Sequence, residues 1–319
     1  MGVCAAIRQA CAAVAAESTH VRVDDEELGR LADRLAAGSL QPTGDDPARR
    51  LQGSEETTLA YILTLDAVNF GSGWFPRLRK RRGMSGYFTV ATALEERFAA
   101  GGAWSAEDLC ALDAGTLTRV LSQDPGDAEV AELMALYARA LNDLGRFLLD
   151  GYAGRFAGLV EEAAGSAEAL VEILARMPFF EDVCEWRGRR VPFYKRAQIT
   201  ASDLALAFGG RGWGAFRDLD RLTIFADNLV PHVLRCEGAL VYDPALAARI
   251  DEEKLVEVGS EQEVEIRACG VHAVECLVAL LGERGAATTA HHLDHVLWDR
   301  GQEPRYKARP RHRSRSVFY

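Results

Sequence analysis

Apolar residues recur at helical spacing along most of this 319-residue chain. After Asp127, which is a good helix-capping residue, apolar side chains return every three or four positions as far as residue 149. This apolar face comprises Val130, Leu133, Met134, Tyr137, Leu141 and Leu144. The capping box S-E-Q-E, from Ser260 to Glu263, predicts a second long helix that we expect to end at Gly282. The pattern therefore predicts a mainly α-helical fold.

The remaining segments add shorter helices and one small β element. The helical pattern also covers residues 4–16, 25–37, 56–68, 86–99, 167–176, 201–208 and 289–300, and the Gly- and Asp-rich residues 38–54 predict a loop. Residues 183–199 alternate instead, which predicts a β-hairpin around Arg187 and Gly188. Without an internal repeat, we expect one compact unit over residues 1–319, or two lobes of about 1–160 and 161–319 with the functional site between them.

Charge is distributed unevenly along the chain. Acidic residues outnumber basic ones, 47 to 37, and a net charge of −10 argues against a general nucleic-acid-binding surface. Basic residues nevertheless gather in residues 300–319. This stretch is either a local anion-binding site or a solvated tail, and its Val-Phe-Tyr ending favours packing over fraying.

Cysteine usage and hydropathy bear on where the protein functions. The 7 cysteines show neither CxxC pairs nor zinc-finger spacing, so we expect reduced thiols in a cytoplasmic protein. No apolar stretch reaches about 18 residues, which predicts that nothing spans a membrane.

Asp227 is the most unusual acid in the chain because it lies in the apolar segment LTIFADNLVP. A carboxylate in such surroundings loses hydration, so it must find donors or its pKa rises. Pro231 disfavours helix just before it, which places Asp227 near a helix start. A plain helix cap is therefore an equally good interpretation of this residue.

A second group of polar residues lies in the segment HHLDHVLWD, residues 291–299. Asp294 and Trp298 are four positions apart and share one helix face. Asp299 falls in the last turn, where the helix dipole disfavours an acid. It therefore has either a specific cationic or donor partner, or an exposed ion pair with Arg300 or another arginine of the C-terminal stretch.

Two histidines and one lysine are further candidates for chemistry. His291 and His295 have the i, i+4 spacing of metal ligands, but no further ligand cluster accompanies them, so we expect no metal site. Lys195 follows two aromatic residues in VPFYKRAQ. It is either an anion-binding or Schiff-base lysine, or an ordinary surface lysine.

Six motifs, taken in order, resemble the queuosine salvage family over residues 56 to 319. They are NFGSGWFP, FYKRAQI, LTIFADNLVP, GSEQEVEIRAC, LDHVLWD and PRHRSRSVFY. The resemblance implies a helical fold similar to helix-hairpin-helix DNA glycosylases. It also implies hydrolysis of the N-glycosidic bond of queuosine 5′-phosphate, releasing queuine, with no metal or organic cofactor.

The resemblance also implies roles for individual residues. Asp227 matches the family's catalytic carboxylate, and Phe225 falls on a pocket position. The substrate-binding residues that we expect besides Phe225 are Asp294, His295, Asp299, Lys195 and Trp298. For the 5′-phosphate, Lys195 and the basic residues 305–315 are the candidates.

Two other functions remain open at this point. A DNA or tRNA base glycosylase would use the same acid, although the net charge of −10 argues against a polymer partner. A non-enzymatic protein that binds a modified nucleoside would need no acid near the anomeric carbon. We expect a small-molecule substrate, no nucleic acid polymer and no membrane partner, and the oligomeric state stays open.

Overall fold

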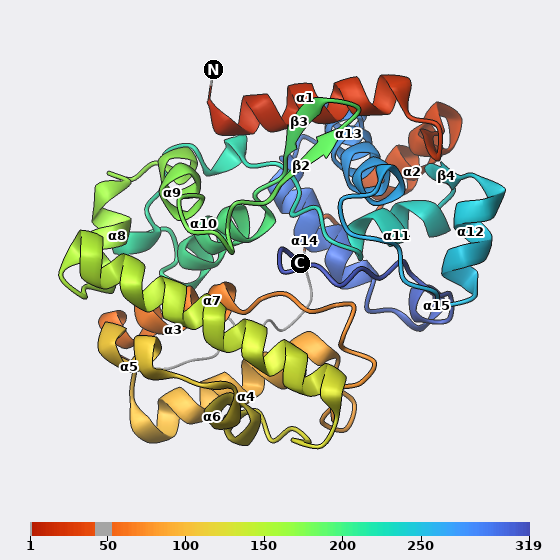
Figure 1. Ribbon diagram of the computed structural model, residues 1–319. Coiled ribbons are helices and arrows are strands. Elements are labelled where there is room, and N and C mark those ends of the chain that lie inside the picture. The colour runs from red at the N-terminus through yellow and green to blue at the C-terminus, as the bar shows by residue number, and fades with distance from the viewer. Residues whose placement is uncertain (1, 42–52) are drawn as a thin grey trace. The chain divides into compact units, whose positions relative to one another are not determined.

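The computed structural model describes residues 2–41 and 53–319 (Figure 1). In this part of the chain, helices predominate and two small antiparallel sheets accompany them, which confirms the predicted mainly α fold with a β-hairpin. Contacts group the described residues into a first unit (2–41, 183–195 and 220–315) and a second unit (53–182, 196–219 and 316–319). The expectation of one compact unit or of two lobes stays a prediction.

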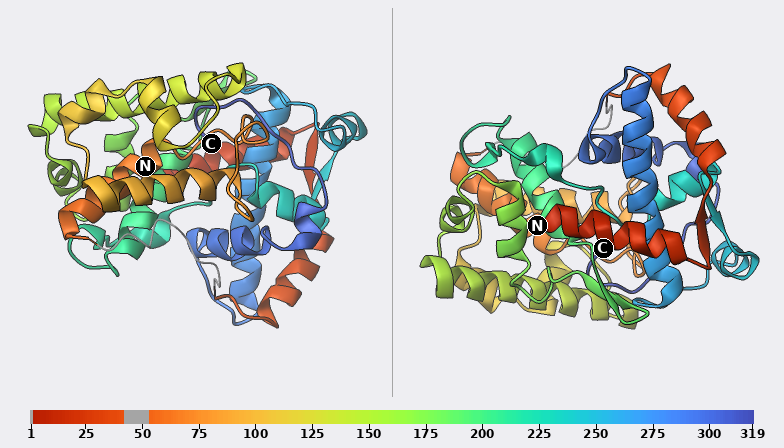
Figure 2. Two further views of the ribbon diagram at one scale, coloured as in Figure 1. Left: turned by 90° about the horizontal axis from the view of Figure 1, so that it is seen from below. Right: turned by 90° about the horizontal axis from the view of Figure 1, so that it is seen from above.

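Helix α13 (Glu261–Glu283) is the central element of the first unit (Figure 2). The elements in contact with it are α1 (Val3–Glu17), β1 (Val21–Val23), α2 (Asp25–Ala36), β2 (Val183–Trp186), α11 (Val230–Cys236), β4 (Leu240–Tyr242) and α14 (Ala290–Arg300). This unit also contains β3 (Arg189–Pro192), α12 (Pro244–Asp251) and α15 (Pro304–Lys307). Because neighbours surround it, the first half of α13 buries polar as well as apolar side chains.

The ends of α13 differ from the prediction in two details. Ser260 caps the helix by accepting the N–H of Glu263, but the Glu263 carboxylate accepts the N–H of Gly259 and not that of Ser260. The helix also continues past Gly282 to Glu283. Gly285, with the positive φ of 76°, is the glycine that follows the helix end, whereas Gly282 lies inside the helix.

The predicted hairpin is confirmed as β2 and β3, which pair from Val183 with Pro192 to Trp186 with Arg189. Its turn residues, Arg187 and Gly188, both have positive φ, as a two-residue type I′ turn requires. The second sheet was not predicted. It pairs β1 with β4, and three-residue strands are too short to show alternation in the sequence.

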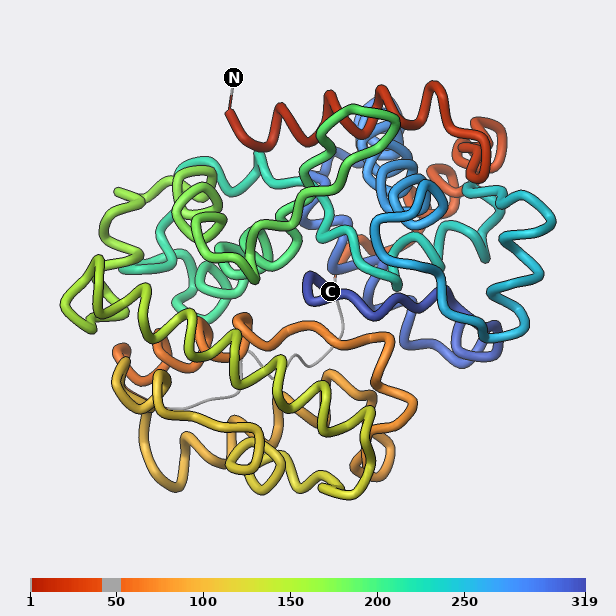
Figure 3. The backbone as a smooth tube through the Cα atoms, in the orientation of Figure 1, coloured from red at the N-terminus to blue at the C-terminus, as the bar shows by residue number. Residues whose placement is uncertain are grey.

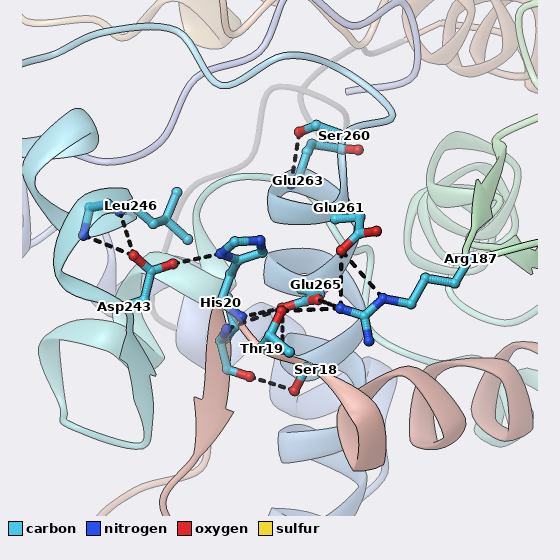
Figure 4. A network of polar contacts seen from close by, with 12 residues as sticks. Ser18, Thr19, His20, Arg187, Asp243, Leu246, Ser260, Glu261, Glu263 and Glu265 are labelled. Atoms are coloured by element: carbon cyan, nitrogen blue, oxygen red, sulfur yellow. Dashed lines mark hydrogen bonds and ion pairs between the residues drawn. The ribbon is translucent and has the colours of Figure 1, made fainter.

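A buried carboxylate fixes the chain between α1 and β1 (Figure 4). One carboxylate oxygen of Glu265 accepts the N–H groups of Thr19, His20 and Val21 at 3.0, 2.6 and 3.3 Å. Arg187 reaches the other oxygen at 3.7 Å and also pairs with Glu261. Glu265 is fully buried, so these donors replace the water that its charge would otherwise bind.

In the described residues of the second unit, the regular secondary structure is entirely helical. Its elements are α3 (Glu55–Ala67), α4 (Gly86–Gly101), α5 (Ala106–Ala111), α6 (Ala114–Val120), α7 (Ala128–Tyr152), α8 (Phe156–Glu162), α9 (Ala167–Leu174), the 3-10 turn η2 (Gly212–Gly214) and α10 (Lys195–Ala207) after its first residue. The predicted cap of α7 is confirmed, because Asp127 accepts the N–H groups of Glu129 and Val130, and its predicted apolar face is buried. The predicted helices generally agree with the structure to within a few residues.

Helix α10 is an exception, because it begins six positions before the predicted residue 201. The missed part was assigned to the alternating segment 183–199. The side chains of Gln198, Thr200, Ser202 and Asp203 are all buried. A helix that buries polar residues on several faces shows no apolar stripe, so periodicity alone could not detect its start.

The basic C-terminal stretch packs against the protein, as its apolar ending predicted. After α15 the chain continues as an extended segment (Figure 3), and the carbonyl of Arg313 accepts the N–H of Val256 at 2.9 Å. Burial then alternates: His312, Ser314 and Ser316 are buried, and the intervening arginines are half-buried.

Two other expectations concern the described residues as a whole. The 7 cysteines, all of them in the described ranges, form no disulfide. Among the helices of residues 2–41 and 53–319, none combines the length and apolar character that crossing a bilayer requires. Most of the loop predicted at 38–54 lies outside the described residues.

Removing the Glu265 carboxylate tests the anchor between α1 and β1. Glu265→Ala leaves the N–H groups of Thr19, His20 and the buried Val21 without this acceptor, and we expect it to lower the free energy of unfolding by about 3–5 kcal/mol. Urea denaturation followed by circular dichroism measures this change. Glu261→Ala, which removes an exposed partner of the same Arg187, is the control and should cost much less. Equal losses in the two variants would contradict the assignment.

Candidate functional site

Asp227 lies in the loop of residues 222–229, between the 3-10 turn η3 (Leu219–Arg221) and α11. The other side chains of this loop are buried, whereas Asp227 is half-buried. Its Oδ1 accepts the N–H of Leu229 at 2.7 Å. Leu229 is the N-cap residue of α11, so Asp227 closes an Asx turn and does not itself cap the helix. Among the described residues no donor bonds Oδ2, which leaves this oxygen to interact with a ligand.

Side chains from other segments hold this loop in place. The N–H of Phe225 donates to Asp294 Oδ1 on α14 at 2.9 Å. The side-chain amide of Asn228 donates to the carbonyl of His312 in the C-terminal segment at 3.2 Å. The conformation around Asp227 therefore depends on residues about 70 to 85 positions away in the sequence.

Asp294 is buried, with 3% of its surface exposed. Burial raises the pKa of its carboxyl group well above the usual 3.8, and the negative charge of Asp227 raises it further. The hydrogen bond from Phe225 and the charge of Lys195 act in the opposite direction but do not cancel the rise. Two carboxyl groups thus lie within electrostatic reach of each other, and the environment of Asp294 favours its neutral form.

Lys195, expected as either an anion-binding or a surface lysine, is 4% exposed. It is the first residue of α10 and follows Tyr194, whose φ of 48° is unusual for a residue other than glycine. Its charge acts on Asp294, which places the ammonium group near the carboxyl pair. The interpretation as a solvent-exposed lysine is therefore wrong.

An aromatic group lines the same region. The ring of Phe225 lies 5.8 Å from that of His295 and 6.4 Å from that of His291, measured between centroids. Burial lowers the pKa of His291 to about 4, so its imidazole is neutral near pH 7. Among the described residues, no group of three or more His, Cys, Asp or Glu side chains is arranged to hold a metal ion. The absence of a metal requirement stays a prediction.

Trp298 and Asp299 lie one turn beyond Asp294 and His295 on α14, and both are half-buried. α14 begins at Ala290 and ends at Arg300, close to the predicted helix 289–300. The contacts described above bring together Asp227, Phe225, Asp294, His295 and Lys195. The binding roles of Trp298 and Asp299 stay predictions.

Arg311 is a further candidate site residue, which the sequence indicated only as part of residues 305–315. Burial lowers the pKa of its guanidinium, and the negative charge of Asp227 acts in the opposite direction. This half-buried cation therefore lies within electrostatic reach of Asp227. The sequence does carry a signal for it, because arginine alternates with histidine or serine from Arg311 to Ser316. The structure buries that histidine and both serines.

The first unit thus contains two carboxyl groups in unlike environments, with a cation near each of them. Such a pair can divide its chemistry, since an ionised carboxylate stabilises positive charge while a neutral one donates a proton. Enzymes that break glycosidic bonds use this combination.

Comparison with known proteins agrees with this class of site. The queuosine salvage protein family matches residues 50–319, and the chain belongs to that family. A Sphaerobacter thermophilus protein named queuosine 5′-phosphate N-glycosylase/hydrolase is 37% identical, over 96% of this chain and 95% of its own. Proteins of the same name from Bos taurus and Mus musculus are each 30% identical, over 98% of both chains.

The raised pKa of Asp294 predicts a pH-dependent effect on stability. Above its unfolded pKa of 3.8 the folded protein retains a proton that the unfolded chain releases, so this residue destabilises the fold as pH rises through its folded pKa. Asp294→Asn removes that term. Between the unfolded and the folded pKa of Asp294, we expect the variant to gain stability relative to the wild type by up to about 1.4 kcal/mol per pH unit.

Urea denaturation at several pH values between about 4 and 8 measures the difference between the two proteins. Asn can still accept the N–H of Phe225, so the loop contact is preserved. A stability difference that does not change with pH would contradict the raised pKa.

Proposed function

We propose that this protein hydrolyses the N-glycosidic bond of queuosine 5′-phosphate and releases queuine. The observation that carries the proposal is the carboxyl pair, Asp227 and Asp294, near the cations Lys195 and Arg311. Relatives that match this chain over nearly its whole length carry the name of that reaction. One acid of the pair can stabilise positive charge on the ribose, and the other can donate a proton to the base.

At the ribose, Asp227 is proposed to stabilise the transition state. Breaking the bond between C1′ and the base nitrogen leaves positive charge on the sugar, because the electron pair departs with the base. An anionic carboxylate in partly dry surroundings stabilises that charge more strongly than water does. The oxygen not used in the Asx turn is the one that we assign to this role.

At the base, Asp294 is proposed to assist departure of the leaving group. Queuine is a 7-deazaguanine, so it lacks the N7 that purines protonate when they leave. Burial favours the neutral form of the Asp294 carboxyl group, which can donate a proton. The proton passes from Asp294 to the base, and the proton released by the water that adds at C1′ restores the carboxyl pair.

The remaining residues are proposed to bind the two ends of the substrate. Phe225 and His295 offer rings against which the base can stack. Asp299, together with Trp298, is assigned to the amine-bearing side chain of queuine, for which a carboxylate is a suitable acceptor. Lys195 and Arg311 are assigned to the 5′-phosphate because each is a cation within electrostatic reach of one of the two carboxyl groups.

Several broader expectations belong to the same proposal. We propose that the helical fold is related to that of helix-hairpin-helix DNA glycosylases, that the substrate is free of a nucleic acid polymer, and that the protein acts in the cytoplasm without a metal or organic cofactor. The net charge of −10 supports a small substrate over a polyanion.

Product release tests the reaction directly. Purified protein is incubated with queuosine 5′-phosphate, and free queuine is separated by chromatography and identified by mass spectrometry. We expect release of queuine over many turnovers. Substrate that stays intact with stoichiometric protein would instead support a non-enzymatic binding protein, and cleavage of a modified tRNA alone would support a polymer glycosylase.

Asp227→Asn tests the role of the acid at the ribose. The substitution preserves shape and the Oδ1 acceptor of the Asx turn but removes the charge. We expect kcat to fall by roughly a hundredfold or more, while queuine binding persists. Single-turnover release of queuine by the folded variant is the measurement. A rate within about threefold of the wild type would assign Asp227 a purely structural role.

Substrate preference tests the proposed phosphate contacts. We expect kcat/KM to be higher for queuosine 5′-phosphate than for queuosine, because Lys195 and Arg311 favour a dianion. Arg311→Ala should reduce this preference, whereas Lys307→Ala, at an exposed position of the same basic stretch, should preserve it. Equal kcat/KM values for the two substrates with the wild-type enzyme would contradict the assignment.

A further inference from the structure

We propose that Arg267 is a positioning residue, which holds the loop of Asp227 and the segment before Lys195 in one arrangement. The inference rests on the proposed function of this site. Arg267 lies on α13 and is fully buried. It belongs to the motif GSEQEVEIRAC, whose first residues form the start of α13 and which has no part in the chemistry proposed above.

Arg267 contacts the backbone immediately before the acid. Its Nε–H donates to the carbonyl of Ala226 at 2.9 Å. Ala226 precedes Asp227, so this bond fixes the orientation of the peptide group that leads into the acid. Together with the bond between Phe225 and Asp294, it anchors two successive residues of the loop to two different helices.

The same guanidinium also contacts the segment that leads to the lysine. Its central carbon lies 3.9 Å from the centroid of the Phe193 ring, a close cation–π contact. Phe193 is buried and stands two positions before Lys195, with the left-handed Tyr194 between them. One side chain therefore contacts the segments that carry both the proposed catalytic acid and the proposed phosphate-binding cation.

Glu263 holds Arg267 in this position. Its carboxylate lies 3.4 Å from a terminal guanidinium nitrogen, and both side chains are fully buried. The other oxygen of Glu263 accepts the N–H of Gly259 at 3.1 Å, so the acid is itself fixed at the start of α13. Glu263 thus holds one terminal nitrogen of the guanidinium, and the Nε–H of the same guanidinium bonds the loop at Ala226.

Stability alone gives little reason for such a pair. Removing two charges from water is costly, and replacing a buried ion pair with apolar residues of similar volume is often neutral or stabilising. An apolar side chain, however, cannot donate to the carbonyl of Ala226. A displacement of about 1 Å at a reacting group can cost a hundredfold in rate, so this bond matters more to kcat than to folding.

The experiment compares two variants that separate positioning from stability. Arg267→Met removes the cation that faces the buried carboxylate of Glu263, and we expect lower stability as well as a kcat at least tenfold below the wild type. The double variant Glu263→Gln/Arg267→Met removes both charges. We expect its stability to recover while kcat stays at least tenfold low, with KM within about threefold of the wild type. Recovery of kcat along with stability would overturn the proposal.

A second measurement does not depend on activity. Hydrogen exchange read by mass spectrometry reports on peptides that cover residues 222–229, where the N–H groups of Phe225 and Leu229 are hydrogen-bonded. We expect exchange in this loop to be at least tenfold faster in the double variant. Unchanged exchange would overturn the proposal even in a protein that released no queuine, and wild-type inactivity would count only against the proposed function.

Two further variants serve as controls. Arg187→Met removes an arginine that likewise bonds a backbone carbonyl, pairs with an acid and lies over an aromatic ring, in this case Glu17, Glu261 and Trp186. It should leave kcat and exchange in the loop of residues 222–229 unchanged. Arg267→Lys keeps the charge opposite Glu263 and loses the planar fork, so it carries the test if Arg267→Met does not fold. Wild-type kcat in Arg267→Lys, with unchanged loop exchange, would overturn the proposal.

Discussion

The hydrogen bond from the N–H of Phe225 to Asp294 is the contact on which the rest of the site depends. It attaches the loop that carries Asp227 to α14, which brings two carboxyl groups within electrostatic reach in a poorly hydrated region. Because both cannot easily be ionised there, the more deeply buried Asp294 retains its proton. The proposed division of roles between these two acids thus rests on their different burial, since the two residues have the same side chain.

Helix α13 provides the polar framework around this pair. Three of its fully buried residues direct their side chains to the backbone of other segments: Glu263 to Gly259, Glu265 to Thr19, His20 and Val21, and Arg267 to Ala226. Segments without regular secondary structure need such partners, because their buried N–H and carbonyl groups lack a helix or sheet to satisfy them. The charges inside α13 therefore fix loops, whereas helix α7, which packs through a conventional apolar face, reaches neighbouring backbone with the uncharged side chains of Tyr137 and Asn142.

Sequence patterns predicted the elements that follow a simple period. Helices α7 and α14 and the hairpin around Arg187 and Gly188 are confirmed because apolar spacing, capping residues and turn residues agree locally. The start of α10 was missed because its buried residues are polar, and the β1–β4 sheet because each strand has three residues and a distant partner. Short helices such as α5 and α6 were not predicted, since less than two turns cannot display an amphipathic period.

The sequence by itself determined the helical class and, through its ordered motifs, the family and the identity of Asp227, Phe225 and Asp294 as candidates. Residue type and spacing are local properties, so they can be read without the fold. Only the tertiary structure decided that Asp294 favours the neutral form, that Lys195 is buried near it, and that Arg311 lies within reach of Asp227. Protonation and electrostatic coupling depend on the burial and separation of groups far apart in the chain, and those quantities exist only once the chain has folded.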